Sequence, residues 1–72
     1  MNCFEVIIAS SPDRKKLVAE IWWDSIHIAE VNQENEKLEI ELYAGQNFKF
    51  SYEEFLRVLE DAKSKLHGLT GI

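Results

Sequence analysis

The hydrophobic period of the chain changes once, at Ser51, and this change restricts the folds that are open to it. Before Ser51, apolar residues recur at every second position, which is typical of strands with one buried face; after it, they recur at helical spacing. Strands followed by a helix predict an α+β domain. A chain of 72 residues has room for one domain, so we expect residues 1–72 to form a single unit. The predicted architecture is an antiparallel β-meander of four to five strands packed on one C-terminal α-helix.

The alternating part of the chain divides into segments separated by turn signals. The clearest alternation is at 38–42, where Leu38, Ile40 and Leu42 alternate with Glu39 and Glu41. This pattern is typical of a half-buried strand with its apolar face on the core. Polar residues with Ser, Pro, Asp or Asn interrupt the pattern between segments. We expect strands at about 3–10, 17–23, 26–32 and 37–43, with a short edge strand at 48–50 as an optional fifth.

The helix has a clear start signal. Ser51 and Glu54 have the spacing of a capping box, and Phe50 and Phe55 have the spacing of a hydrophobic staple. Gly68 suits the left-handed residue that follows a helix, so we expect the helix at about 51–67. Its predicted apolar stripe consists of Tyr52, Phe55, Leu56, Leu59, Ala62 and Leu66.

The turn between the second and third strands leaves two registers open. A two-residue turn at 24–25 places Ile21 and Ile28 on one face. A three-residue turn that takes in Ile26 pairs Ile21 with Ala29 instead, and agrees better with the alternation of the fourth strand. We favour the three-residue turn.

Two adjacent tryptophans must lie on opposite faces of their strand. Trp23 then anchors the core and Trp22 lies on the outer face. Trp22 is either an exposed aromatic, of the kind enriched at interfaces, or is partly covered by Tyr43 or by a loop.

The negative charge is concentrated in the middle of the chain. Residues 17–48 carry seven acidic residues and one lysine, a net charge of −6, while the remaining residues carry +1. An acidic rim around aromatic side chains is a suitable surface for a basic protein partner; the alternative is a solvated face kept acidic for solubility. The expected contact residues are Glu20, Trp22, Asp24, Glu39, Glu41 and Tyr43.

Composition argues against several other functions. A net charge of −5 is unfavourable for binding nucleic acid or an anionic membrane, and we interpret the one basic run, Ser11–Lys16, as a solvated loop. No apolar run approaches the length of a membrane helix, and the first residues lack the pattern of a signal peptide. We therefore expect a cytoplasmic protein.

The residues that could carry catalysis do not form a recognisable set. Cys3, the one cysteine, has no partner for an internal disulfide and is distant in the expected topology from His27 and His67. Asp24, His27 and Glu30 have the atom types of metal ligands, but their spacing matches no recognised site. We expect no enzyme, no metal and no cofactor.

Four segments together resemble a group of small bacterial proteins, some of which are assigned as immunity proteins of polymorphic toxin systems. They are Val6–Ala9, Leu17–Asp24, Ala29–Glu34 and Phe55–Leu66, although Ser25 stands where the family pattern has the glycine of an Asp-Gly turn. The resemblance implies a protein that neutralises a toxin by binding it. We expect a non-enzymatic protein-binding domain that acts by occlusion, with a homo-oligomeric structural domain as the alternative.

Overall fold

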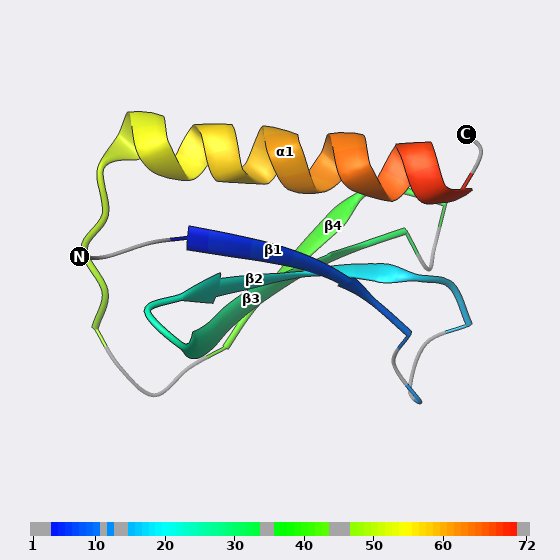
Figure 1. The fold of residues 1–72 in the computed structure, drawn as a ribbon, viewed down its shortest axis with the longest axis horizontal. Coiled ribbons are helices and arrows are strands. Elements are labelled where there is room, and N and C mark those ends of the chain that lie inside the picture. Colours follow the sequence, from blue (N-terminus) through cyan, green and yellow to red (C-terminus); the bar gives the residue numbers. More distant parts are fainter. Residues whose placement is uncertain (1–3, 11, 13–14, 34–35, 44–46, 71–72) are drawn as a thin grey trace.

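The fold is a four-stranded sheet with one helix lying along one of its faces (Figure 1). The strands are antiparallel in the order β1-β2-β3-β4, which confirms the predicted α+β meander and its C-terminal helix. The elements are β1 (Phe4–Ala9), β2 (Val18–Trp23), β3 (Ile26–Asn32), β4 (Glu39–Leu42) and α1 (Tyr52–Thr70). The computed structural model describes residues 4–10, 12, 15–33, 36–43 and 47–70.

The core lies between α1 and the face of the sheet that we call the inner face; the opposite face is the outer face. Ile21 and Leu66 are its largest fully buried side chains. Three alanines, Ala19, Ala29 and Ala62, are also fully buried in this cluster, and their small side chains let the helix approach the sheet closely. The core is therefore thin and depends on a few large residues.

The start of α1 agrees with its sequence signals. The backbone N–H of Glu54 donates to Ser51 Oγ at 3.3 Å, and the N–H of Phe55 donates to the Ser51 carbonyl at 3.0 Å. The rings of Phe50 and Phe55 stack with their centroids 5.5 Å apart, as a hydrophobic staple requires. Cap and staple together fix the point at which the chain enters the helix.

The end of α1 differs from the prediction. The helix continues to Thr70, so Gly68 lies inside it and not after it. Glycine weakens a helix by about 1 kcal/mol, but it keeps its N–H and clashes with nothing, so it does not stop helical hydrogen bonding.

The turn between β2 and β3 combines features of both predicted registers. Ile26 pairs with Trp23, so the turn has two residues. The favoured prediction of a three-residue turn that includes Ile26 was therefore wrong. Ile21 nevertheless pairs with Ala29, as expected for the longer turn. A β-bulge reconciles the two, because Ile28 is an extra residue on β3 between these pairs and has no partner on β2.

Two successive residues of the turn adopt left-handed backbone conformations. Asp24 has φ 49° and Ser25 has φ 70°. Positive φ at both central positions is the geometry of a type I′ turn, which matches the twist of a hairpin. Asp tolerates this region better than most residues, but Ser25 is strained there, because its Cβ crowds the backbone.

Replacing Ser25 with glycine is expected to stabilise the protein by about 1 kcal/mol, because glycine adopts positive φ without a Cβ penalty. Urea unfolding measures the change. The matched control is Ser64→Gly at an exposed position within α1, which should lower stability by about 0.5 kcal/mol. A loss of stability in both variants would refute the strain at Ser25.

Residues 48–50 do not form the optional fifth strand. The rings of Phe48 and Phe50 both pack edge-on against Trp23, at centroid distances of 5.7 and 5.2 Å. Because both aromatic side chains pack on the core, this segment crosses the end of the sheet and leads to α1. The yellow-green trace in Figure 1 shows this path. The segment therefore closes the core and does not extend the sheet.

The inner face of β4 is not covered, contrary to the sequence-based expectation. Leu38, Ile40 and Leu42 are 38, 50 and 70% exposed. The helix packs on β1 and β2, makes fewer contacts with β3 and does not reach β4. A helix is about 10 Å wide and strands lie about 4.8 Å apart, so one helix cannot cover four strands.

The helix side that faces this gap is exposed as well. Tyr52 and Leu56 were expected in the buried stripe, but both are exposed, and Val58 packs on the core instead. The buried stripe is therefore rotated about the helix axis, away from Tyr52 and Leu56 and towards Val58.

None of the helices in the described part of the chain is long and apolar enough to cross a membrane. Cys3 and the residues Ser11, Asp13 and Arg14 of the basic run lie outside the described residues.

Candidate functional site

A row of three glutamates crosses the outer face of the sheet. Glu20 on β2 lies directly opposite Glu30 on β3, and Glu30 lies directly opposite Glu41 on β4. Like charges at directly opposite positions destabilise a sheet. The row therefore requires compensation from neighbouring groups, and the surrounding side chains supply it.

The central glutamate is buried and receives two side-chain hydrogen bonds. Glu30 is 5% exposed. Asn32 Nδ2 donates to Glu30 Oε2 at 3.1 Å, and the Tyr43 hydroxyl donates to Glu30 Oε1 at 3.3 Å. A buried carboxylate is costly unless donors satisfy it, so these two bonds hold Glu30, Asn32 and Tyr43 in one arrangement.

A second row, of aromatic rings, runs beside the glutamates. Trp22 stacks on His27 with ring centroids 4.8 Å apart and planes within 9° of parallel. His27 in turn meets the edge of Tyr43 at 4.7 Å and 62°. The Trp22 indole N–H donates to Glu20 Oε1 at 3.1 Å, which ties the two rows together. The outer face thus presents parallel acidic and aromatic rows across β2, β3 and β4.

Trp22 is partly covered by His27, whereas the sequence suggested Tyr43 or a loop as the cover. The indole is half-buried, because the imidazole covers one of its faces. The His27 Nε2 atom is itself buried and has no hydrogen-bond partner in the described part of the chain. The ring of His27 therefore serves as packing surface between Trp22 and Tyr43.

The Tyr43 phenol responds to its position beside two carboxylates. Burial, followed by the negative charges of Glu30 and Glu41, raises the pKa of Tyr43 from 10.0 to about 12. The folded state thus favours the neutral phenol, which can donate to Glu30. Since the folded pKa exceeds the unfolded one, this contribution to stability is complete below about pH 10 and is lost as the pH rises from 10 to 12.

The expected titration can be measured directly, because the chain has two tyrosines. In a Tyr52→Phe variant, phenolate absorbance should report a midpoint near 12 for Tyr43. Adding Glu30→Gln removes one negative neighbour and should move the midpoint down towards 10.0. A midpoint of 10.0 in the single variant, with a circular dichroism spectrum that remains folded, would contradict the assigned environment.

The structure brings most of the predicted contact residues together. Glu20, Trp22, Glu41 and Tyr43 are linked by the contacts described above, and Glu39 lies opposite Asn32, two pairs from the Glu30–Glu41 pair. Asp24 lies apart from the rows.

Asp24 is exposed in the turn, where it lines a shallow hollow. The hollow has a volume of about 400 Å³, and its other lining residues are Phe4, Glu5, Trp22 and Ser25. Asp24 therefore adds charge at one end of the outer face.

Sequence reasoning missed three residues that organise this face: His27, Glu30 and Asn32. The signal was present, since the favoured pairing of Ile21 with Ala29 also sets Glu30 opposite Glu20. Alternation indicates the direction of a side chain but not its burial, and Glu30 and Asn32 are buried on a face that alternation marks as polar.

The described residues contain no group of three His, Cys, Asp or Glu side chains placed to hold a metal ion, so Asp24, His27 and Glu30 do not form one. No protein-family model, curated protein or solved structure matches the chain.

Proposed function

We propose that this chain is a small, non-enzymatic protein-binding domain that engages a basic protein partner. The observation that carries the proposal is the pair of parallel rows on the outer face, one of glutamates and one of aromatic rings, across three adjacent strands. Negative charge steers a basic partner and fixes its orientation, while tryptophan and tyrosine are the side chains that most often dominate binding energy.

Hydrogen bonding within the face supports the proposal. Trp22 is held by Glu20, and Tyr43 is held by Glu30, so both aromatic side chains are ordered before a partner arrives. Ordering a long side chain on binding costs about 0.5–1.5 kcal/mol. A face whose side chains are already fixed avoids part of this cost.

The partner that we propose is a toxin, which the domain neutralises by occluding its surface. The resemblance to bacterial immunity proteins supports this choice, and nuclease toxins are commonly basic, which suits an acidic face. We propose the bacterial cytoplasm as the location.

The product of the neighbouring gene is the partner to test first, by pull-down and then by titration calorimetry. The double variant Trp22→Ala/Glu41→Lys should weaken binding at least about 30-fold, since it removes a central aromatic and reverses a charge. The control is Glu60→Lys, an equal charge reversal at an exposed position on α1. Equal affinity of the double variant and the parent would rule out the named surface.

The second candidate is a homo-oligomeric structural domain. The exposed inner face of β4, with Ile40 and Leu42, favours it, because small domains often gain stability by burying such residues against a copy. Sedimentation separates the two candidates: a monomer of 8.4 kDa at every concentration contradicts self-association.

A further inference from the structure

β4 is an edge strand with backbone groups directed away from the sheet. The N–H of Tyr43 donates to the carbonyl of Ile28 at 3.0 Å, so these residues form a hydrogen-bonded pair. Such pairs alternate along an antiparallel ladder. The N–H and C=O groups of Ile40 and Leu42 therefore point to the outer edge of β4, where no other described strand pairs.

The inner side of this edge opens on an apolar groove. Leu42 of β4 lines a hollow of about 280 Å³ together with Ile28, Phe48, Phe50 and Phe55. This volume lies just below the usual range for small-molecule pockets, about 300–1,000 Å³, and suits apolar side chains better than a whole ligand.

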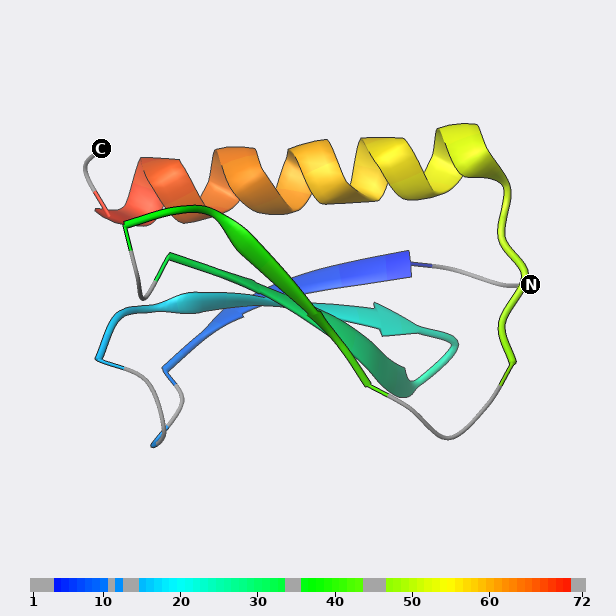
Figure 2. The same ribbon diagram turned by 180° about the vertical axis from the view of Figure 1, so that it is seen from behind.

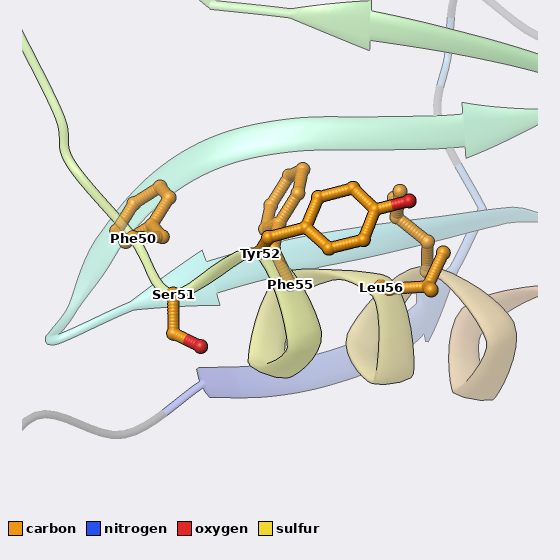
Figure 3. A pocket seen from close by; sticks show the side chains of 6 residues that line it. Phe50, Ser51, Tyr52, Phe55 and Leu56 are labelled. Carbon is orange, nitrogen blue, oxygen red and sulfur yellow. The ribbon is translucent and has the colours of Figure 1, made fainter.

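The groove continues on the side of α1 that the sheet leaves exposed. Phe50 and Phe55 also line a second hollow of about 290 Å³, with Tyr52, Leu56 and Leu59. Figure 3 shows the Tyr52 ring extending along the helix towards Leu56. In Figure 2, β4 runs obliquely to α1 and diverges from it towards the C-terminal end of the strand. Phe50 and Phe55 line both hollows, so the two apolar hollows are neighbours.

The outer side of β4 is acidic. Glu39 and Glu41 alternate with Ile40 and Leu42, and both glutamates are exposed. An added strand would therefore meet backbone groups at the edge, apolar side chains on the inner face and carboxylates on the outer face. Its own side chains would have to alternate in the same way.

These charges disfavour a second copy as the added strand. When two antiparallel β4 strands overlap over at least three residues, apolar residues meet apolar residues only if Ile40 lies opposite Ile40 or opposite Leu42. The first register sets Glu39 opposite Glu41, and the second sets Glu41 opposite Glu41. Like charges directly opposite each other are destabilising, so each register that matches the apolar residues is opposed by its glutamates.

We propose that β4 binds an extended segment of a basic protein partner by strand addition, with lysine or arginine alternating with apolar residues. The basic side chains lie beside Glu39 and Glu41, and the apolar side chains enter the groove next to Leu42. Main-chain hydrogen bonds supply affinity and the alternating side chains supply specificity. This inference rests on the proposed function for the basic partner and adds the mode of binding.

The test uses the full chain and a short synthetic peptide in which lysine and valine alternate. Nuclear magnetic resonance titration should show binding, and the amides of Ile40 and Leu42 should become protected from hydrogen exchange. Leu42→Pro removes an edge N–H without touching the bonds to β3, and should weaken binding at least tenfold. Its matched control, Leu42→Ala, shortens the side chain, keeps the N–H and should retain more of the affinity.

Charge exchange keeps the test decisive if Leu42→Pro does not fold. The Glu39→Lys/Glu41→Lys variant should no longer bind the lysine–valine peptide. It should instead bind a peptide in which glutamate alternates with valine. Retained preference for the lysine peptide overturns the proposal, as does unchanged affinity in folded Leu42→Pro. A dimer that Leu42→Ala preserves and the lysine peptide cannot displace also overturns it, in favour of a second copy.

The neighbouring gene product separates this inference from the proposed function. Binding that is lost in Trp22→Ala and kept in Leu42→Pro supports the outer face and overturns strand addition. Binding that is lost in Leu42→Pro and kept in Trp22→Ala does the opposite.

Discussion

Leu66→Ala is expected to lower the free energy of unfolding by about 3 kcal/mol. Leu66 is a fully buried side chain of the helix and packs in the cluster with Ile21 and the core alanines. Removing a buried leucine costs about 2–5 kcal/mol, because the lost contacts leave a cavity. A domain of this length has a total stability of about 4–11 kcal/mol, so one substitution removes a large share.

Leu56→Ala is the control, since it makes the same change on the same helix. Leu56 is 45% exposed and lies outside the core cluster, so we expect a loss below about 1 kcal/mol. Urea unfolding followed by circular dichroism measures both. Equal losses in the two variants would show that α1 does not pack as described.

Asn32→Asp is expected to destabilise the protein by at least about 3 kcal/mol at neutral pH. Asn32 is 2% exposed, and its amide donates to Glu30 at 3.1 Å. Aspartate has nearly the same shape but replaces that donor with a second carboxylate. Two buried charges of one sign in contact repel each other, and breaking a buried charged pair by removing one partner typically costs 3–5 kcal/mol.

The loss should depend on pH in a definite direction. Repulsion from Glu30 raises the folded-state pKa of the introduced carboxyl above the unfolded value of about 4. The variant therefore retains its stability while the pair holds a proton, and loses it as the pH rises through the raised folded value. Urea unfolding midpoints measured from pH 4 to pH 8 test whether the stability of the variant falls as the pH rises. Asn47→Asp, the same change at an exposed position, should change stability by less than about 0.5 kcal/mol throughout; an Asn32→Asp variant that matched it would disprove the buried pair.

The arrangement of elements could be predicted because it depends on local signals. Ser51 and Phe50 mark the helix start through their own backbone and ring contacts, and alternation marks the strands. Coverage of the sheet could not be predicted in this way. Leu42 has the same alternation as Ile21, yet one is exposed and the other is fully buried. The difference arises from the position of the helix, which depends on packing over the whole sheet.

In the candidate site too, some features follow from local sequence signals and others do not. The outward direction of Trp22 and Glu41 follows from alternation, and the structure places both on the outer face. The contact of His27 with Trp22 follows from the two-residue turn, which pairs these two residues before the bulge is reached. The favoured three-residue turn pairs Trp22 with Ile28 instead. Neither turn length included an extra residue in β3, so the combination of the Trp22–His27 and Ile21–Ala29 pairs could not be predicted.

The extra residue at Ile28 has a consequence for changes in chain length. Between the pairs Trp22–His27 and Ile21–Ala29, β3 is one residue longer than β2. Deleting Ile28 joins His27 to Ala29. It removes one core side chain and the hydrogen bond from Tyr43, but it keeps the pairs between β2 and β3 and the face on which each remaining residue of β3 lies. A single deletion within β2, which has no such surplus, exchanges the two faces of everything beyond it. The second hairpin therefore contains one point at which the chain can shorten without turning its buried side chains to water.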